Sequence, residues 1–234
     1  MKYCFLFLVL LSWSVQSNAQ NSDPLVHTLS QLDSIQHSNT IAKYFGGLYV
    51  NFLLTIETQL KSDDSTDKEM ARKFEQVFAH YFIDASHAYE TGHPIASPYW
   101  EAYFADTTLD ILQYKLLGAN AHLNGELWQA LTYSFTAEEM KRFRPQFGIF
   151  RKTMNKLYTP IYREGYKEND KLLFLHIASI GTVKWVGNVY LYKWICRQMK
   201  LAQLYWAGSP RFERVLKRVE RRKRFIDNIV VRVL

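Results

Sequence analysis

The sequence predicts an all-α fold: a multi-helix bundle with long central helices and a basic C-terminal helix. Apolar residues recur at helical spacing through most of the chain, and no stretch alternates apolar and polar residues between turn signals. Only 10 Gly and 6 Pro occur among the 234 residues, so strand-and-turn architectures lack turn residues. With 48% apolar residues the chain can bury a sizeable core, which we assign to one domain over residues 20–234.

Residues 1–19 have the pattern of a signal peptide. Lys2 precedes an apolar run, and the small residues that end at Ala19 form a cleavage site. We therefore expect a periplasmic or secreted protein, with an uncleaved N-terminal anchor as the alternative. Cleavage removes Cys4 and leaves Cys196, whose apolar surroundings are typical of a buried thiol, so no disulfide partner is expected.

Helix signals delimit the first half of the domain. Asp23-Pro24 opens an amphipathic helix, and the second helix is apolar on most sides. The third helix is capped at its start by Ser65 or Thr66 and ends at Gly92 and Pro94. In chain order, helices are expected over about residues 24–38, 40–60, 66–90 and 97–106.

The second half contains four more expected helices. A long one covers about residues 107–134, Thr136 caps the next, and a long apolar helix runs from about 170 to 206. Because His176 and Lys184 interrupt its apolar run, we expect a core helix there rather than a membrane span. The last helix, residues 210–234, follows a break at Ala207-Gly208-Ser209-Pro210.

Two helices carry polar residues that are candidate metal ligands. In the stretch NAHLNGEL, His122 and Glu126 are one helical turn apart, while His80, Asp84 and His87 point within roughly 60° of one another on the earlier helix. Imidazole and carboxylate groups are zinc ligands, and bundles build metal sites from facing helices. This pattern predicts a zinc site and a metal-dependent hydrolase of phosphoester-like substrates, since bound zinc lowers the pKa of water to about 7. A structural polar network is the alternative.

The same stretch supports a family resemblance. LLGANAHLNGELWQAL resembles the signature of an uncharacterised bacterial family whose members carry a helix close to "GMNAHIN-x-DLPLA". The preceding FEQVFAHYFIDA is similar to that family's "F-A-N-L-Y-F-D-A" helix. The resemblance implies an all-helical fold and no transferable activity. Its motif residues here are Asn120, His122, Asn124 and Glu126, with Glu126 where the family has Asp.

A looser similarity connects HLNGELWQAL with the "H-x-x-G-D-x-x-Q-P-L-H" helix of zinc-dependent phospholipase C and related single-strand nucleases. There, the His and the Asp four residues later bind zinc. His122, Gly125, Glu126 and Gln129 match in order, whereas Thr132 stands at the place of the closing His. The similarity therefore implies at most a reduced zinc site.

The positive charge of the chain is concentrated at its C-terminal end. The helix RFERVLKRVERRKRFIDNIVVRVL places Arg218, Arg221, Arg222, Lys223 and Arg224 among apolar residues. This pattern suits contact with an anionic membrane surface, or a solvated helix whose apolar stripe packs on the domain. We expect no nucleic-acid partner for an exported chain. Two functions thus stay open: a metal-dependent hydrolase, and a non-catalytic helical binding module that contacts lipid or cell-surface components.

Overall fold

The computed structural model describes residues 24–61, 67–170 and 182–233. Every regular element in these residues is a helix, which confirms the predicted all-α class. In this part of the chain no helix is both long and apolar enough to cross a membrane. The predicted signal peptide and His176 lie outside the described residues, so export stays a prediction.

The described elements follow the predicted order closely. They are α1 (Pro24–Gln36), α2 (Ala42–Lys61), α3 (Asp67–Glu90), η1 (Pro98–Trp100), α4 (Glu101–Phe104), α5 (Ile111–Ala121), η2 (His122–Glu126), α6 (Leu127–Ser134), α7 (Ala137–Glu168), α9 (Thr182–Trp206) and α10 (Phe212–Val233). Element η1 is a 3₁₀ turn and η2 is a π-helical turn, in which the backbone makes a wider turn than in an α-helix.

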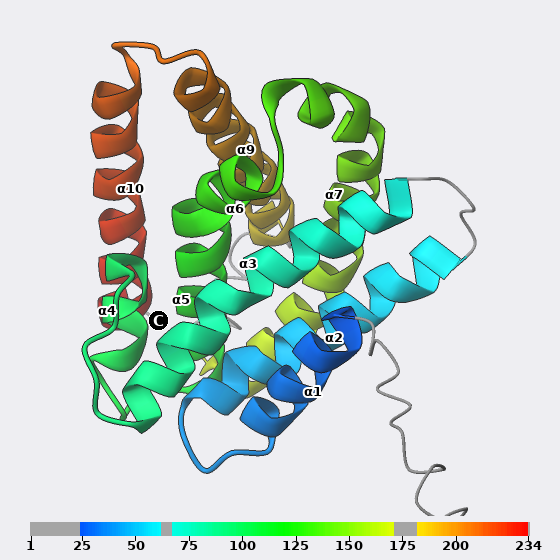
Figure 1. Cartoon of the computed structure of the whole chain (residues 1–234). Coiled ribbons are helices and arrows are strands. Elements are labelled where there is room, and N and C mark those ends of the chain that lie inside the picture. The colour runs from blue at the N-terminus through cyan, green and yellow to red at the C-terminus, as the bar shows by residue number, and fades with distance from the viewer. Residues whose placement is uncertain (1–23, 62–66, 171–181, 234) are drawn as a thin grey trace, which may run out of the picture.

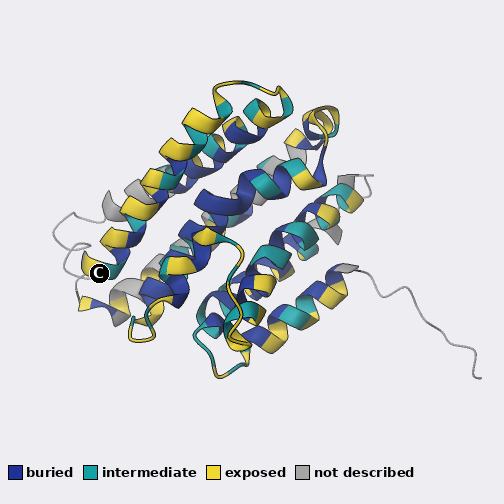
Figure 2. Ribbon diagram, turned by 60° about the vertical axis from the view of Figure 1, so that its left-hand side comes forward, coloured by how far each residue is buried: buried dark blue, intermediate teal, exposed yellow. Residues whose placement is uncertain are grey.

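One continuous helical run, α5–η2–α6, forms the centre of the bundle. It packs against α2 and α3 on one side and against α9 and α10 on the other (Figure 1). Most of its residues are buried, as Figure 2 shows. The run therefore has protein on most sides, so polar side chains on it need partners inside the molecule.

Local capping fixes where the central run and the next helix begin. The Asp110 carboxylate accepts a hydrogen bond from the Gln113 backbone N–H, and the Gln113 side chain accepts one from the Asp110 N–H. Thr136 and Glu139 form the same reciprocal arrangement at the start of α7. These two capping boxes satisfy helix-end amides that would otherwise lack partners.

A stripe of aromatic residues on α3 packs in the core against the central run. Phe74, Phe78 and Phe82 follow one another at helical spacing, and each is at most 1% exposed. Phe78 stacks on the His122 ring at 3.5 Å between centroids.

Cys196, expected to be buried, is instead an exposed free cysteine on α9, so that prediction was wrong.

Candidate functional site

The π-helical turn η2 contains the NAHLNGEL motif and arises from an inserted side chain. The carboxamide of Gln198, from α9, accepts a hydrogen bond from the Trp128 backbone N–H at 3.0 Å and donates one to the Asn124 carbonyl at 2.6 Å. In a regular α-helix those two backbone groups would bond to each other. The Gln198 side chain therefore takes the place of one backbone hydrogen bond of the helix, which accounts for the wider turn.

Gly125 lets a loop approach this turn closely. A Cβ at Gly125 would lie 2.6 Å from the Tyr99 ring, a distance that real Cβ atoms essentially never show. The absence of a side chain brings η1 directly against η2. Trp100 of η1 is consequently placed next to the Glu126 side chain.

His122 and Glu126 form a buried pair, as their spacing predicted. Nδ1 of His122 lies 3.4 Å from Oε2 of Glu126, and the two residues are 2% and 0% exposed. Burial raises the pKa of Glu126 to about 8 and lowers the pKa of His122 well below its ordinary 6.5. Both groups are therefore neutral at pH 7, and the protonated carboxyl of Glu126 can donate a hydrogen bond to the His122 imidazole.

Two further donors hold Glu126 and were missed in the sequence. Oε1 of Glu126 accepts hydrogen bonds from the Ser97 hydroxyl at 2.6 Å and from the Trp100 indole N–H at 2.8 Å. These bonds act against the burial that raises the pKa of the carboxyl. The sequence offered one signal for these bonds: a buried Trp usually donates its indole N–H to a partner. That signal did not identify Glu126 as the acceptor.

The other three predicted ligands do not join this pair. Asp84 and His87 are exposed on α3, and Nδ1 of the half-buried His80 bonds the Gln76 carbonyl at 2.8 Å. Among the described residues, no group of three or more His, Cys, Asp or Glu side chains is arranged to hold a metal ion. The predicted five-ligand set is therefore not assembled here, and zinc binding itself stays a prediction.

The asparagines of the motif join the central run to α10. The Asn120 side chain donates to Oδ1 of Asp227 at 2.8 Å and to the Lys223 carbonyl at 3.0 Å. Asn124 donates to the Asn120 side-chain oxygen at 3.1 Å. The Lys223 ammonium pairs with Oδ2 of Asp227 at 2.8 Å and also donates to the Tyr99 carbonyl. We call Asn120, Asn124, Lys223 and Asp227 the polar lock.

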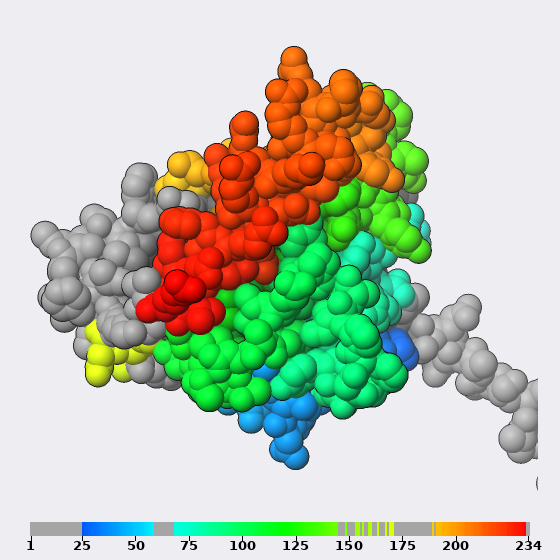
Figure 3. All heavy atoms as spheres, turned by 90° about the vertical axis from the view of Figure 1, so that its left-hand side faces the viewer, coloured from blue at the N-terminus to red at the C-terminus, as the bar shows by residue number. Residues whose placement is uncertain are grey.

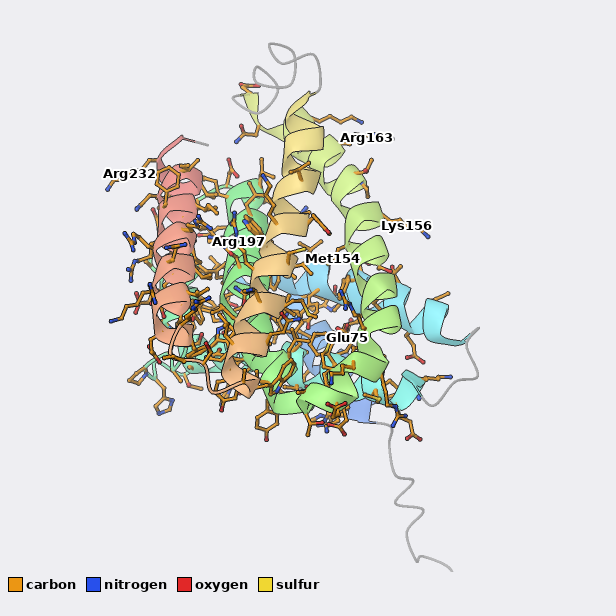
Figure 4. The ribbon with its side chains drawn as sticks, turned by 90° about the horizontal axis from the view of Figure 1, so that it is seen from above. Glu75, Met154, Lys156, Arg163, Arg197 and Arg232 are labelled. Carbon is orange, nitrogen blue, oxygen red and sulfur yellow. The ribbon has the colours of Figure 1, made fainter. Side chains whose placement is uncertain are left out.

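A second buried acid lies on α3, inside the bundle (Figure 4). Burial raises the pKa of Glu75 to about 8, and Oε2 of this side chain has no hydrogen-bond partner among the described residues. Glu75 and Glu126 together raise the pKa of Tyr49, after the larger effect of burial. The interior around Tyr49 therefore holds two carboxyl groups that are neutral at pH 7.

The exposed side of α10 gathers positive charge, and we call these exposed side chains the α10 face. Its cations are Arg214, Lys217, Arg218, Arg221, Arg222, Arg224 and Arg232. Figure 3 looks onto this side, with α10 running across it, and Figure 4 shows Arg232 at the outer edge of the helix. Lys223 was predicted to contact an anion but is 3% exposed in the polar lock, so that assignment was wrong.

Comparisons with known proteins establish the family. The model of a family of unknown function, DUF5995, matches residues 23–232, which is nearly the whole chain. The chain belongs to this family. The match confirms the predicted membership of an uncharacterised family and reaches from α1 to α10. No curated protein and no solved structure matches the chain.

Proposed function

We propose that the chain is a non-catalytic helical binding module that engages an anionic lipid or cell-surface component through the α10 face. The observation that carries the proposal is the charge of this face. Seven Lys and Arg side chains are exposed on α10, and Glu213 is the only fully exposed acid described on the helix. A basic cluster of this density attracts anionic surfaces at about 1 kcal/mol per side chain.

The polar lock supports the same function, because it holds α10 in one orientation. Lys223 and Asp227 lie on the inner side of the helix and bond to α5 and to the Tyr99 carbonyl. Gln113 adds a hydrogen bond to the Val230 carbonyl at 2.9 Å, near the C-terminal end of α10. A helix fixed along its length presents its cations without a further ordering cost on binding.

The hydrolase hypothesis receives less support from the same geometry. His122 bonds to Glu126, and Glu126 also accepts hydrogen bonds from Ser97 and from Trp100 of η1. The asparagines of the motif bond to α9 and α10. These contacts give each polar residue of the motif an internal role in support of the fold. We therefore interpret the motif as structural: its asparagines position α10, and His122 and Glu126 hold the segment of Ser97 and Trp100.

Charge removal on the α10 face tests the proposal. The double variant Arg218→Ala/Arg221→Ala removes two exposed cations, and the matched control Lys156→Ala/Arg163→Ala removes two exposed cations from α7 (Figure 4). Binding is measured by sedimentation with phosphatidylglycerol vesicles and by titration with inorganic polyphosphate. We expect the α10 variant to bind anionic ligand about 30-fold more weakly, which corresponds to about 2 kcal/mol.

The control variant and high salt complete the test. The α7 variant should bind like the original chain, and added salt should weaken binding because it screens exposed charges. The proposal is wrong if the original chain binds neither ligand at low salt, or if both double variants lose affinity equally.

A further inference from the structure

Phe225 stands in the middle of the cations on the α10 face. At about 100° per residue, Arg214, Arg218, Arg221, Phe225 and Arg232 all point within roughly 60° of one another. The Phe225 side chain is 64% exposed, although Phe is among the residues most often buried. Ile229, one turn later on the same side, is 39% exposed. The α10 face is therefore cationic with an apolar centre.

The apolar stripe that holds α10 to the bundle is a different set of residues. Val219 and Val230 are 3% and 5% exposed and belong to the core, together with half-buried Val215 and Ile226. Phe225 and Ile229 are thus not needed for packing in the described fold. A free amphipathic helix would offer its apolar stripe to a membrane, whereas here that stripe is already covered by the protein.

We propose that the partner of the α10 face is the surface of an anionic lipid bilayer, into which Phe225 and Ile229 insert. The inference rests on the proposed function and names its ligand. A bilayer surface offers phosphate groups to the arginines and an apolar layer a few ångströms deeper to the Phe ring. A soluble polyanion offers the first kind of contact without the second, so it would leave Phe225 in water.

The geometry of α10 suits a helix that lies flat on the surface. From Arg214 to Arg232 the helix is about 27 Å long, since each residue adds about 1.5 Å. Arginine side chains have long apolar stems, so their charged ends can stay at the level of the head groups while the ring between them goes deeper. Phe225 and the arginines share one side of α10, so the ring points toward the bilayer whenever the arginines do. The polar lock keeps that side turned away from the bundle.

The variant Phe225→Ala separates bilayer insertion from charge attraction. We compare its binding to phosphatidylglycerol vesicles with its binding to inorganic polyphosphate. Tyr133→Ala is the matched control, since Tyr133 is a 77% exposed aromatic residue on α6. Insertion predicts that Phe225→Ala loses about tenfold or more in affinity for vesicles, keeps its affinity for polyphosphate, and folds as before, because the ring is exposed.

The outcomes distinguish this inference from the proposed function. Unchanged vesicle affinity in Phe225→Ala, or an equal loss for both ligands, overturns insertion while the charge-removal result still stands. If the original chain binds polyphosphate but not vesicles, bilayer insertion is also overturned, and the partner is a soluble or polymeric anion. A loss confined to vesicles, and absent in Tyr133→Ala, supports the bilayer as the partner.

Discussion

The buried acids predict that the protein loses stability as the pH rises through neutrality. Glu75 and Glu126 have a pKa of about 8 in the folded chain against an ordinary value of 4.5, and burial is the main cause for both. Between these values the folded chain keeps two protons that the unfolded chain has released. A state that binds more protons is favoured at lower pH, so the free energy of unfolding decreases as the pH rises.

His122 changes the expected slope below pH 6.5. Burial lowers its pKa in the folded chain, so the unfolded chain binds one extra proton below about pH 6.5. One proton of difference corresponds to about 1.4 kcal/mol per pH unit. The free energy of unfolding should therefore fall by about 1.4 kcal/mol per unit between pH 5 and 6.5. Between pH 6.5 and 8 it should fall by about 2 kcal/mol per unit, because the folded carboxyl groups begin to release their protons as the pH approaches 8.

The variant Glu126→Gln tests this calculation. The amide keeps an oxygen for the Ser97 and Trp100 donors but cannot titrate. The slope between pH 6.5 and 8 should therefore fall by more than half, from about 2 to about 0.8 kcal/mol per unit. Urea unfolding at a series of pH values measures it, with Glu138→Gln as a surface control that should keep the full slope. Equal slopes in the original chain and Glu126→Gln would refute the reasoning, because Glu126 would then be ionised in the folded protein.

Three other substitutions have clear expectations for stability, each measured by urea unfolding. Gln198→Leu removes the partners of the Trp128 N–H and of the Asn124 carbonyl, and should lower the free energy of unfolding by about 3 kcal/mol. Asp227→Ala leaves a buried ammonium unpaired and should cost about 3 kcal/mol or more. The double variant Asp84→Asn/His87→Gln changes two exposed side chains and should stay within about 0.5 kcal/mol of the original chain; a larger loss would show that these residues act inside the fold.

Helix positions could be predicted from the sequence because each helix carries its own periodicity and caps. The start of α5 shows the limit of this approach. The sequence suggested a start near residue 107, whereas the helix begins at Ile111 after the Asp110 cap. Asp106 binds the Thr108 backbone N–H and hydroxyl instead, in a local turn. Two acids four residues apart offer competing caps, and only the packing of the following helix selects between them.

The candidate site shows what periodicity cannot decide. His80, Asp84 and His87 do share one side of α3, as their spacing predicted, but that side is partly or fully exposed. The inward side is defined by Phe78 and Phe82, which repeat at helical spacing and were visible in the sequence. A stripe of apolar aromatics is a stronger signal for the buried side of a helix than a stripe of candidate ligands, because burial of the aromatic rings contributes more free energy.

Lys223 was assigned to the surface because it stands in a run of basic residues. Its helical position contradicts that assignment: Val219, Lys223, Asp227 and Val230 follow the spacing of one face. The spacing also places Asp227 one turn after Lys223, where an ion pair forms. The helical spacing in the sequence therefore predicts the buried Lys223–Asp227 pair. Treating all basic residues of this run as one exposed cluster led to the wrong assignment.

The polar lock connects the two parts of the molecule that the sequence singled out separately. A buried ion pair contributes little stability compared with apolar residues of the same size, yet it requires one geometry for all of its hydrogen bonds. Asn120 meets this requirement by bonding Asp227 and the Lys223 carbonyl at the same time. Apolar packing alone would tolerate a rotation of α10 that turns Phe225 and the neighbouring arginines toward the bundle. The two asparagines of the NAHLNGEL motif thus help to fix which side of α10 faces outward.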